Sequence, residues 1–431
     1  MLSKLYDFIG IGIGPYNLSL AALTEDMHDI DCIFFDESSR MQWHPGMLIE
    51  GTDLQVPFLA DLVTFADPTS RFSFLNYLKQ HNRLYKFFFF HTMEVPRQEY
   101  SDYLKWAANQ ISGLYFGKKV VDVIDQDDHY EIVTQDSETG TRESCLANHI
   151  VMATGSEPLI LENMQGFPDK DVIHTSQYLY EKEALMESDH ITVVGSGQSA
   201  AEVFYDLLEE REDKEFQLTW LTRSKGIFQL EAAKLGQEFF SPDYVDYFHK
   251  LPLNKRKEAL DTLEPLRNGV AHQTLNGIYE MLYHYSIGGE NPKVNIQLMT
   301  EVQDIQEVND QYILNCHQWQ TENDFQHKTE KVILATGYKP NIPDWFIERF
   351  KEKVVWEDDM MFEISRNYEL KFKKYRKHRF YAVTNLEHSH GTAATNLVLA
   401  VQRNMEIINH MTGEARFDLD GVSVFQQFNQ L

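Results

Sequence analysis

The sequence predicts an α/β fold, because an apolar run typical of a strand is followed twice by a glycine-rich turn and the start of a helix. The first turn lies at residues 10–18 and the second at 195–200, roughly 180 residues apart. A strand, a glycine turn and a helix in this order bind a dinucleotide pyrophosphate, since the glycines let the backbone approach the phosphates and the helix N-terminus favours negative charge. Two such turns predict two Rossmann-like domains and two dinucleotides, as in a flavoprotein that is reduced by a nicotinamide cofactor.

The first unit spans residues 5–36, with strands expected at 8–13 and 30–35 around a helix that starts at Asn17. An acidic residue about 20 positions beyond the glycines accepts a hydrogen bond from a ribose hydroxyl. Asp36 fits this position, and Glu37 is a near alternative. Asn17 stands where the fingerprint has its third glycine, which is a departure from the pattern. The residues that we expect at the first dinucleotide are Gly12, Gly14, Pro15, Asn17, Leu18 and Asp36.

The second unit starts near residue 189, and its second strand is expected at 217–221. Arg223 and Lys225 follow that strand, where the first unit has an acid. A cation at this position suits the 2′-phosphate and favours NADPH over NADH, whereas the alternative is that both residues are ordinary surface charges. The residues that we expect at the second dinucleotide are Gly195, Gly197, Gln198, Ser199, Arg223, Lys225, Thr336, Gly337 and Tyr338.

Three further stretches stand out along the chain. Two apolar strands end in the same Ala-Thr-Gly sequence, at 150–155 and 332–338, and repeated strands of this kind commonly connect the two nucleotide domains of a flavoprotein. Residues 228–290 break the α/β rhythm and are rich in aromatic and helix-forming residues, so we expect a small helical insertion there. The four consecutive phenylalanines at 87–90 predict a buried strand.

The composition excludes several classes of protein. A net charge of -27 argues against nucleic-acid binding, which needs a basic face, and no apolar run is long enough to span a bilayer. Cys32, Cys145 and Cys316 show no CxxC pair, no metal-site spacing and no disulfide framework. We therefore expect no metal site and a reducing, cytoplasmic location. A disulfide reductase does not fit, because it needs a redox pair of cysteines.

Together these motifs resemble the siderophore-biosynthetic, N-hydroxylating flavin monooxygenases, which are the lysine/ornithine N-monooxygenase group. The resemblance runs essentially end to end. Its specific pieces are residues 12–18, 43–47, 54–63, 74–78, 195–202, 335–338 and 390–391.

The resemblance implies an FAD-binding domain formed by residues 1–188 and 339–431, and an NADPH-binding domain at 189–338 that carries the helical substrate region at about 228–290. It places six residues near the FAD in addition to the glycine turn: Trp43, His44, Met47, Gln55, His390 and Gly391. It also implies the reaction. NADPH reduces FAD, O2 forms a C4a-hydroperoxyflavin, and a neutral primary amine attacks the distal oxygen. No side chain is assigned as a catalytic residue, since the flavin supplies the chemistry.

Ala60 is the informative departure from the family pattern. Members that act on lysine or ornithine typically carry a lysine there, which pairs with the substrate carboxylate. Alanine resembles the branch that hydroxylates diamines, although another cation, Lys234 or Arg267, could have taken over the carboxylate. The resemblance assigns Gln237, Asn268 and Val398 to the substrate region as well.

The expected activity is hydroxylation of putrescine to N-hydroxyputrescine for a hydroxamate siderophore. Cadaverine, L-lysine and L-ornithine are the alternative substrates, and a non-catalytic, flavin-binding redox sensor is the alternative from a different class. The resemblance further implies a homo-oligomer, a tetramer or a dimer.

Overall fold

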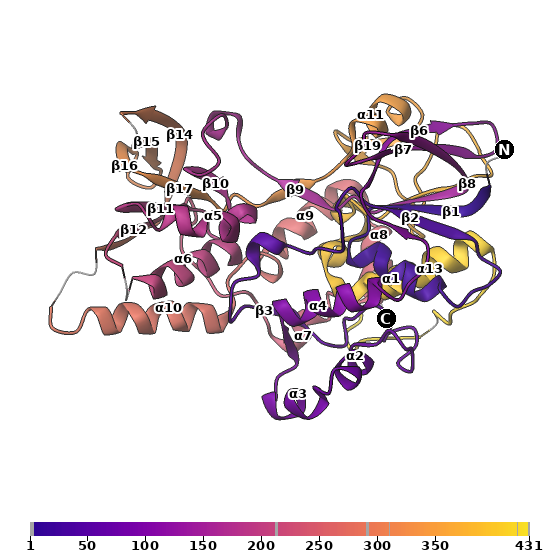
Figure 1. Ribbon diagram of the computed structural model, residues 1–431, viewed down its shortest axis with the longest axis horizontal. Helices are drawn as coiled ribbons and strands as arrows, with labels where there is room; N and C mark the ends of the chain where they lie inside the picture. The colour runs from indigo at the N-terminus through magenta and orange to yellow at the C-terminus, as the bar shows by residue number, and fades with distance from the viewer. Residues whose placement is uncertain (1–3, 212–213, 290–292, 310, 420, 430–431) are drawn as a thin grey trace.

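The computed structural model describes residues 4–211, 214–289, 293–309, 311–419 and 421–429. Two sheets with parallel strands lie at opposite ends of an elongated molecule (Figure 1). The α/β prediction is confirmed. The expected domain bounds at residues 1, 290 and 431 lie outside the described residues.

The first sheet combines strands from both ends of the chain. Its order is β5-β2-β1-β8-β7-β6, and β21 pairs with β8. Its members are β1 (Leu5–Ile11), β2 (Cys32–Phe35), β5 (Leu114–Tyr115), β6 (Lys118–Asp125), β7 (Tyr130–Asp136), β8 (Arg142–Met152) and β21 (Phe380–Ala382). In the parallel core, Ile9 of β1 lies between Ile33 and Ile150 of the neighbouring strands. Central parallel strands are covered on both faces, which explains why β1 is apolar without alternation.

Helices from distant parts of the chain cover this sheet. α1 (Pro15–Thr24) packs against α13 (Ala400–Thr412) and against α4 (Arg97–Ala108). The C-terminal helix therefore helps to cover the same sheet as the first helix.

The second sheet is entirely parallel, with the order β10-β17-β11-β12-β13. Its members are β10 (Val172–His174), β17 (Lys331–Leu334), β11 (His190–Val194), β12 (Gln217–Leu221) and β13 (Val294–Gln297). α6 (Gln198–Glu210) packs its buried face onto it, and Phe204 contacts Trp220 at a ring separation of 4.7 Å. β10 pairs with β17 and so belongs to the second sheet, although its residues precede the expected domain boundary at residue 189.

A small antiparallel sheet lies beside the second sheet. It consists of β14 (Thr300–Val308), β15 (Gln311–Gln318) and β16 (Asn323–Thr329).

The described part of the stretch 228–290 is helical, as expected. It contains α7 (Lys234–Gln237), α8 (Pro242–His249), α9 (Leu253–Thr262), a 3-10 turn (Glu264–Leu266) and α10 (His272–Tyr285). α10 packs on α6 of the second sheet, whereas α8 and α9 contact α12 (Glu387–His390) of the returning chain.

A two-stranded ribbon connects the two large sheets. β9 (Ser156–Pro158) runs antiparallel to β18 (Tyr338–Pro340), directly after each Ala-Thr-Gly sequence (Figure 1). The Thr154 hydroxyl donates to the Asn341 carbonyl at 2.6 Å, and the Thr336 hydroxyl donates to the Leu159 carbonyl. The repeated threonines thus tie the two crossing segments together.

The prediction of a buried strand at 87–90 is wrong. The segment forms α3 (Leu84–Phe90) instead, and the side chains of Phe88, Phe89 and Phe90 are exposed. Only Phe87 packs inward, against Phe58 and Phe74. A short apolar run does not distinguish a strand from a helix, and burial was inferred from hydrophobicity alone.

Asp125, at the end of β6, joins the antiparallel part of the first sheet to the returning chain. Its carboxylate accepts hydrogen bonds from Lys353 at 2.9 Å, Arg376 at 2.9 Å and His378 at 2.8 Å. Burial alone would raise the pKa of Asp125, but the hydrogen bonds from Lys353 and His378 and the charge of Arg376 outweigh it and leave the pKa below its ordinary value.

Within the described parts of the chain, no helix combines the length and apolar character needed to cross a bilayer.

Asp125→Asn should lower the free energy of unfolding by about 3 kcal/mol, because it leaves the largely buried guanidinium of Arg376 without its counter-charge. Since the pKa of Asp125 is lowered by folding, its contribution is present above the ordinary carboxyl pKa and is lost as the pH falls through the folded value. Urea titrations at several pH values test this, and the difference between wild type and variant should shrink in acid. Asp128→Asn, at an exposed carboxyl on the same hairpin, is the matched control. Equal losses from both variants would contradict the role of Asp125.

Candidate functional site

The first glycine turn is a backbone cradle at the carboxyl end of β1. Gly12 adopts φ of +88°, and a Cβ atom there would overlap the carbonyl oxygen of Ala153. Gly14 faces open space, and α1 starts beside it without a side-chain cap. Free backbone N–H groups beside an open glycine suit a pyrophosphate.

Asn17 and Asp36 hold this first turn in place. The Asn17 amide is fully buried and donates to the Gly12 carbonyl at 2.8 Å. This contact gives a physical reason for an asparagine where the fingerprint has a glycine. The Asp36 carboxylate, at the end of β2, accepts from the backbone N–H of Ile13 at 2.7 Å. Asp36 therefore lies beside the turn, as the sequence predicts, and its contact with a ribose stays a prediction. Pro15 and Leu18 are buried in α1.

The second turn repeats the geometry of the first. Gly195 has φ of +147°, and a Cβ atom there would overlap the carbonyl oxygen of Ala335. Gly197 faces open space, and α6 also begins without a side-chain cap. Both turns therefore fit a dinucleotide for the same two reasons: open space beside the second glycine, and free backbone N–H groups at the start of the helix.

The Gln198 side chain is engaged within the protein. Its amide donates to Glu202 at 2.9 Å and to Thr274 at 3.2 Å, and its oxygen accepts from the Ala271 backbone at 2.7 Å. Gln198 thus joins α6 to the start of α10. Ser199 follows it in the first turn of α6.

Arg223 and Lys225 lie just beyond β12, and both are exposed. Neither forms an ion pair with any of the residues that the structure describes. The indole of Trp319 donates to the Arg223 carbonyl at 2.9 Å and so fixes the loop. The two cations remain available for a 2′-phosphate.

An aromatic group lies where the ribbon meets the two sheets. The Tyr338 ring contacts the rings of His174 and His44 at 5.0 and 6.1 Å, and Trp43 contacts His44 at 4.8 Å. His174 also lies 3.0 Å from the Gly337 carbonyl. His44 is exposed, as is Gln55 on β3 (Asp53–Pro57).

Three predicted FAD neighbours are enclosed by protein. Met47 is only 3% exposed and packs in the core of the second sheet, because Gly46 lies directly against the Ser176 carbonyl. His390 is 1% exposed, with its ring stacked on Tyr368 at 4.2 Å.

Burial first, and then the charge of Arg366, hold the pKa of His390 well below its ordinary value. Gly391, with φ of +81°, packs on Phe248. The positions of Met47, His390 and Gly391 are thus fixed by protein contacts, and their expected place near the FAD stays a prediction.

The predicted substrate residues lie on separate segments. Gln237 and Asn268 come from adjoining stretches, since the Glu231 backbone donates to Pro265 at 3.0 Å. Val398 packs against the same small core of Val245, Ala393 and Leu399 as Phe240 of the helical region. Ala60 follows β3 and is 3% exposed, with the Tyr100 hydroxyl 3.5 Å from its carbonyl. No hydrogen bond among the described residues joins Ala60 to Gln237, Asn268 or Val398.

Arg267 is already paired. Its Nη1 lies 2.6 Å from Oε2 of Glu387, which stands three positions before His390. Lys234, by contrast, is exposed and forms no ion pair within the described ranges. Of the two cations proposed as substitutes for the family lysine, one is therefore neutralised inside the protein.

An ion pair that sequence reasoning missed connects the two glycine-turn units. Arg97, at the start of α4, forms a bidentate pair with Glu202 of α6 at 2.7 and 2.9 Å and donates to the Met47 carbonyl at 2.9 Å. The Glu202 side chain is 3% exposed. The only signal in the sequence was the position of Glu202 at the end of a family motif.

No group of three or more metal-binding side chains comes together within the described residues. The donors that converge are backbone N–H groups and cations, which suit phosphates.

Comparisons with known proteins agree with this geometry. The chain is 38% identical to a putrescine N-hydroxylase of Shewanella oneidensis over 98% of its own length and 84% of that protein. Its structure is similar to that of FAD-bound DfoA, the cadaverine monooxygenase of the desferrioxamine pathway of Erwinia amylovora, with a TM-score of 0.94, 34% identity and 99% of each chain covered.

A second similar structure is the ornithine N-hydroxylase KtzI of Kutzneria with reduced FAD, NADP+ and L-ornithine. Its TM-score is 0.89 at 25% identity, over 95% of this chain and 99% of that one. The model of the L-lysine 6-monooxygenase/L-ornithine 5-monooxygenase family matches residues 4–340. With its two glycine cradles and this match, the chain belongs to the L-lysine 6-monooxygenase/L-ornithine 5-monooxygenase family.

Proposed function

We propose that the protein hydroxylates one amino group of an aliphatic diamine, putrescine, to give N-hydroxyputrescine in hydroxamate siderophore biosynthesis, with FAD, NADPH and O2. The observation that carries the substrate class is a buried alanine at position 60, together with the pairing of Arg267 to Glu387. The similarity to a putrescine N-hydroxylase and a cadaverine monooxygenase supports it.

The first glycine turn would hold the FAD pyrophosphate, with Gly12, Gly14 and Asp36 around it, and the second would hold that of NADPH. When bound, NADPH supplies the electrons, and the flavin with O2 supplies the oxygen atom that reaches the amine. Arg223 and Lys225 would bind the 2′-phosphate, which distinguishes NADPH from NADH.

The protein must deliver the amine in its neutral form, because an ammonium has no lone pair. An aliphatic amine has a pKa of about 10.4 in water, and a desolvated site lowers it. The surroundings of Ala60 are dry, since Ala60, Leu62 and Tyr100 are buried. The same exclusion of water protects the oxidising equivalent from decay to hydrogen peroxide. No side-chain base is required.

A substrate carboxylate would lack a partner at position 60. Alanine offers no charge, and Arg267 is held by Glu387 at 2.6 Å. Lys234 is the one of the two alternative cations that has no ion pair among the described residues, but it is exposed to solvent, where a carboxylate gains little from pairing. An unpaired buried carboxylate is costly, so a diamine fits position 60 better than lysine or ornithine does. Cadaverine, with one more methylene, is the second candidate. A methylene is worth about 1–3 kcal/mol in a pocket, which activity measurements resolve.

The proposal also covers the division into domains. We expected an FAD-binding part at residues 1–188 and 339–431, and an NADPH-binding part at 189–338 with the helical substrate region at 228–290. The pairing of β10 with β17 supports starting the NADPH-binding part before residue 172 instead of at residue 189. We also propose that the chain forms a homo-oligomer, a dimer or a tetramer. Its three cysteines are free, which supports a cytoplasmic location.

The first test is the amount of hydroxylamine formed per NADPH consumed, with FAD present, for putrescine, cadaverine, L-lysine and L-ornithine. We expect tight coupling with putrescine and little product from either amino acid. Coupling with an amino acid would overturn the substrate class but leave the enzyme class intact. NADPH consumption that yields only hydrogen peroxide with every amine would contradict the proposed reaction.

Ala60→Lys should lower kcat/KM for putrescine by about tenfold or more, because it overfills the site and places a cation beside a cationic substrate. Turnover of ornithine or lysine should rise, since the new ammonium can pair with a carboxylate. Ala60→Met separates size from charge and should lose putrescine turnover without gaining amino-acid turnover. Unchanged selectivity in Ala60→Lys would remove the argument from position 60.

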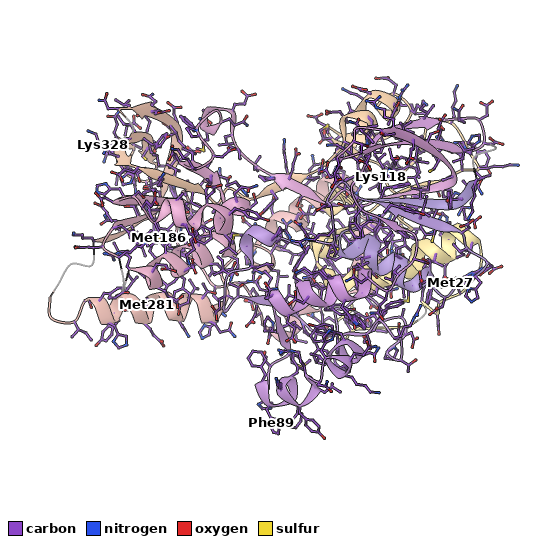
Figure 2. The ribbon with its side chains drawn as sticks, viewed as in Figure 1. Met27, Phe89, Lys118, Met186, Met281 and Lys328 are labelled. Carbon is purple, nitrogen blue, oxygen red and sulfur yellow. The ribbon has the colours of Figure 1, made fainter. Side chains whose placement is uncertain are left out.

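Arg223→Ala should raise the KM for NADPH by about 10- to 100-fold, because it removes one or two charge-assisted hydrogen bonds to the 2′-phosphate. The KM for NADH, which lacks this phosphate, should change little. Stopped-flow reduction of bound FAD by each nucleotide measures this. Lys328→Ala removes an exposed cation from β16 in the same lobe and serves as control (Figure 2). Equal effects on both nucleotides would rule out a contact between Arg223 and the 2′-phosphate.

A further inference from the structure

Two exposed aromatic stripes lie along one edge of the molecule. On α3, Tyr85, Phe88 and Phe89 are 80%, 69% and 76% exposed. On α10, Tyr279 and Tyr283 are 72% and 61% exposed, one helical turn apart. Both helices lie along the lower edge in Figure 1, and Phe89 lies at the projecting tip in Figure 2. Surfaces of this kind mark interaction sites, since a monomer gains nothing from exposing them.

The two stripes carry opposite charge. Residues 68–93, which include α3, contain no aspartate or glutamate, although the chain as a whole has a net charge of -27. Lys79 and Lys86 are exposed there and form no ion pair with described residues. The α10 stripe is bordered by Glu280 and by Glu209 of α6. Both carboxylates lie close to Tyr205 of α6, which packs on α10 at Gly277, and they add to the effect of burial in raising the pKa of Tyr205.

We propose that α3 of one copy of this chain docks on α10 of a second copy. A two-fold axis makes the contact occur twice. The basic α3 stripe of each copy then packs on the acidic α10 stripe of the other copy. A symmetric contact of α3 with α3 would instead bring Lys86 of both copies together. The α3–α10 pairing satisfies both the apolar surface and the charges.

The size of the contact is sufficient. An aromatic side chain buries about 150–250 Å² in a packed contact, so covering the exposed parts of five on each copy removes on the order of 1,400 Å². Specific, stable interfaces bury about 1,200–2,000 Å². The proposal is independent of the substrate, because none of the five aromatic side chains belongs to a glycine turn or to the predicted substrate residues.

Light scattering of the FAD-loaded protein at micromolar concentration is the first measurement, and we expect at least a dimer. Phe89→Asp and Tyr283→Asp should each raise the dissociation constant by about 30-fold or more, as for aromatic hot spots. Tyr375→Asp changes a residue that is 91% exposed outside both stripes and should leave the mass unchanged. A monomeric wild type, or a mass that Phe89→Asp does not alter, would overturn the proposal.

A charge exchange tests which stripes meet. Lys86→Glu and Glu280→Lys should each weaken association, and the double variant should restore it, because each contact then pairs the exchanged charges. In a disulfide test, Phe89→Cys with Tyr283→Cys should cross-link two chains. The three native cysteines should not, since burial raises the pKa of Cys32 to about 11 and that of Cys316 to about 12, and it also raises the pKa of Cys145.

The competing occupant of α3 is an anionic membrane surface. Sedimentation with phosphatidylserine vesicles distinguishes it. A wild-type monomer that binds these vesicles through Phe89 would replace the dimer with a membrane contact. No vesicle binding together with loss of the dimer in Phe89→Asp supports the proposal.

Discussion

The structure depends on a close approach of two backbones that occurs once in each large sheet. Gly12 lies against the carbonyl of Ala153, and Gly195 lies against that of Ala335, with no room for a side chain at either glycine. This contact sets where α1 and α6 begin and so where their free N–H groups converge. It also fixes the Ala-Thr-Gly strands, whose threonines start the connecting ribbon. In each large sheet, the same glycine contact therefore shapes the dinucleotide-binding turn and positions the strand that leads into the connecting ribbon.

Much of this could be predicted from local sequence. Strand, turn and helix have distinct periodicities, so the positions of β1, β2, α1, β11, β12 and α6 follow from short stretches. Asp36 was placed by its spacing from the glycines. The contact of the glycines with Ala153 and Ala335 was not foreseen, although both motifs were recognised, because it joins segments more than a hundred residues apart.

The burial of one segment was predicted wrongly, and the cause is physical. Phe87–Phe90 were expected to be buried because they are apolar, and yet three of them face outward on α3. Met47 and His390 are each enclosed by residues from a distant segment, Ser176 and Tyr368, and their expected place near the flavin stays a prediction. Burial is decided by tertiary contacts, which hydrophobicity and motif position do not encode. The pair of Arg97 and Glu202 was missed for the same reason, and it links α4, α6 and Gln198 across the two units.

The ribbon of β9 and β18 has a consequence for the order in which the chain folds. The chain leaves the first sheet at β9 and returns beside the same point at β18, so everything between them emerges from the ribosome before β21 exists. The second sheet can therefore be complete while β8 still lacks a neighbour. Once the intervening unit has folded, its two ends are already adjacent, so pairing β21 with β8 requires closing only the stretch 341–379 rather than the whole stretch 153–379. A defect in the inserted unit would then appear first as a failure to complete the first sheet during synthesis.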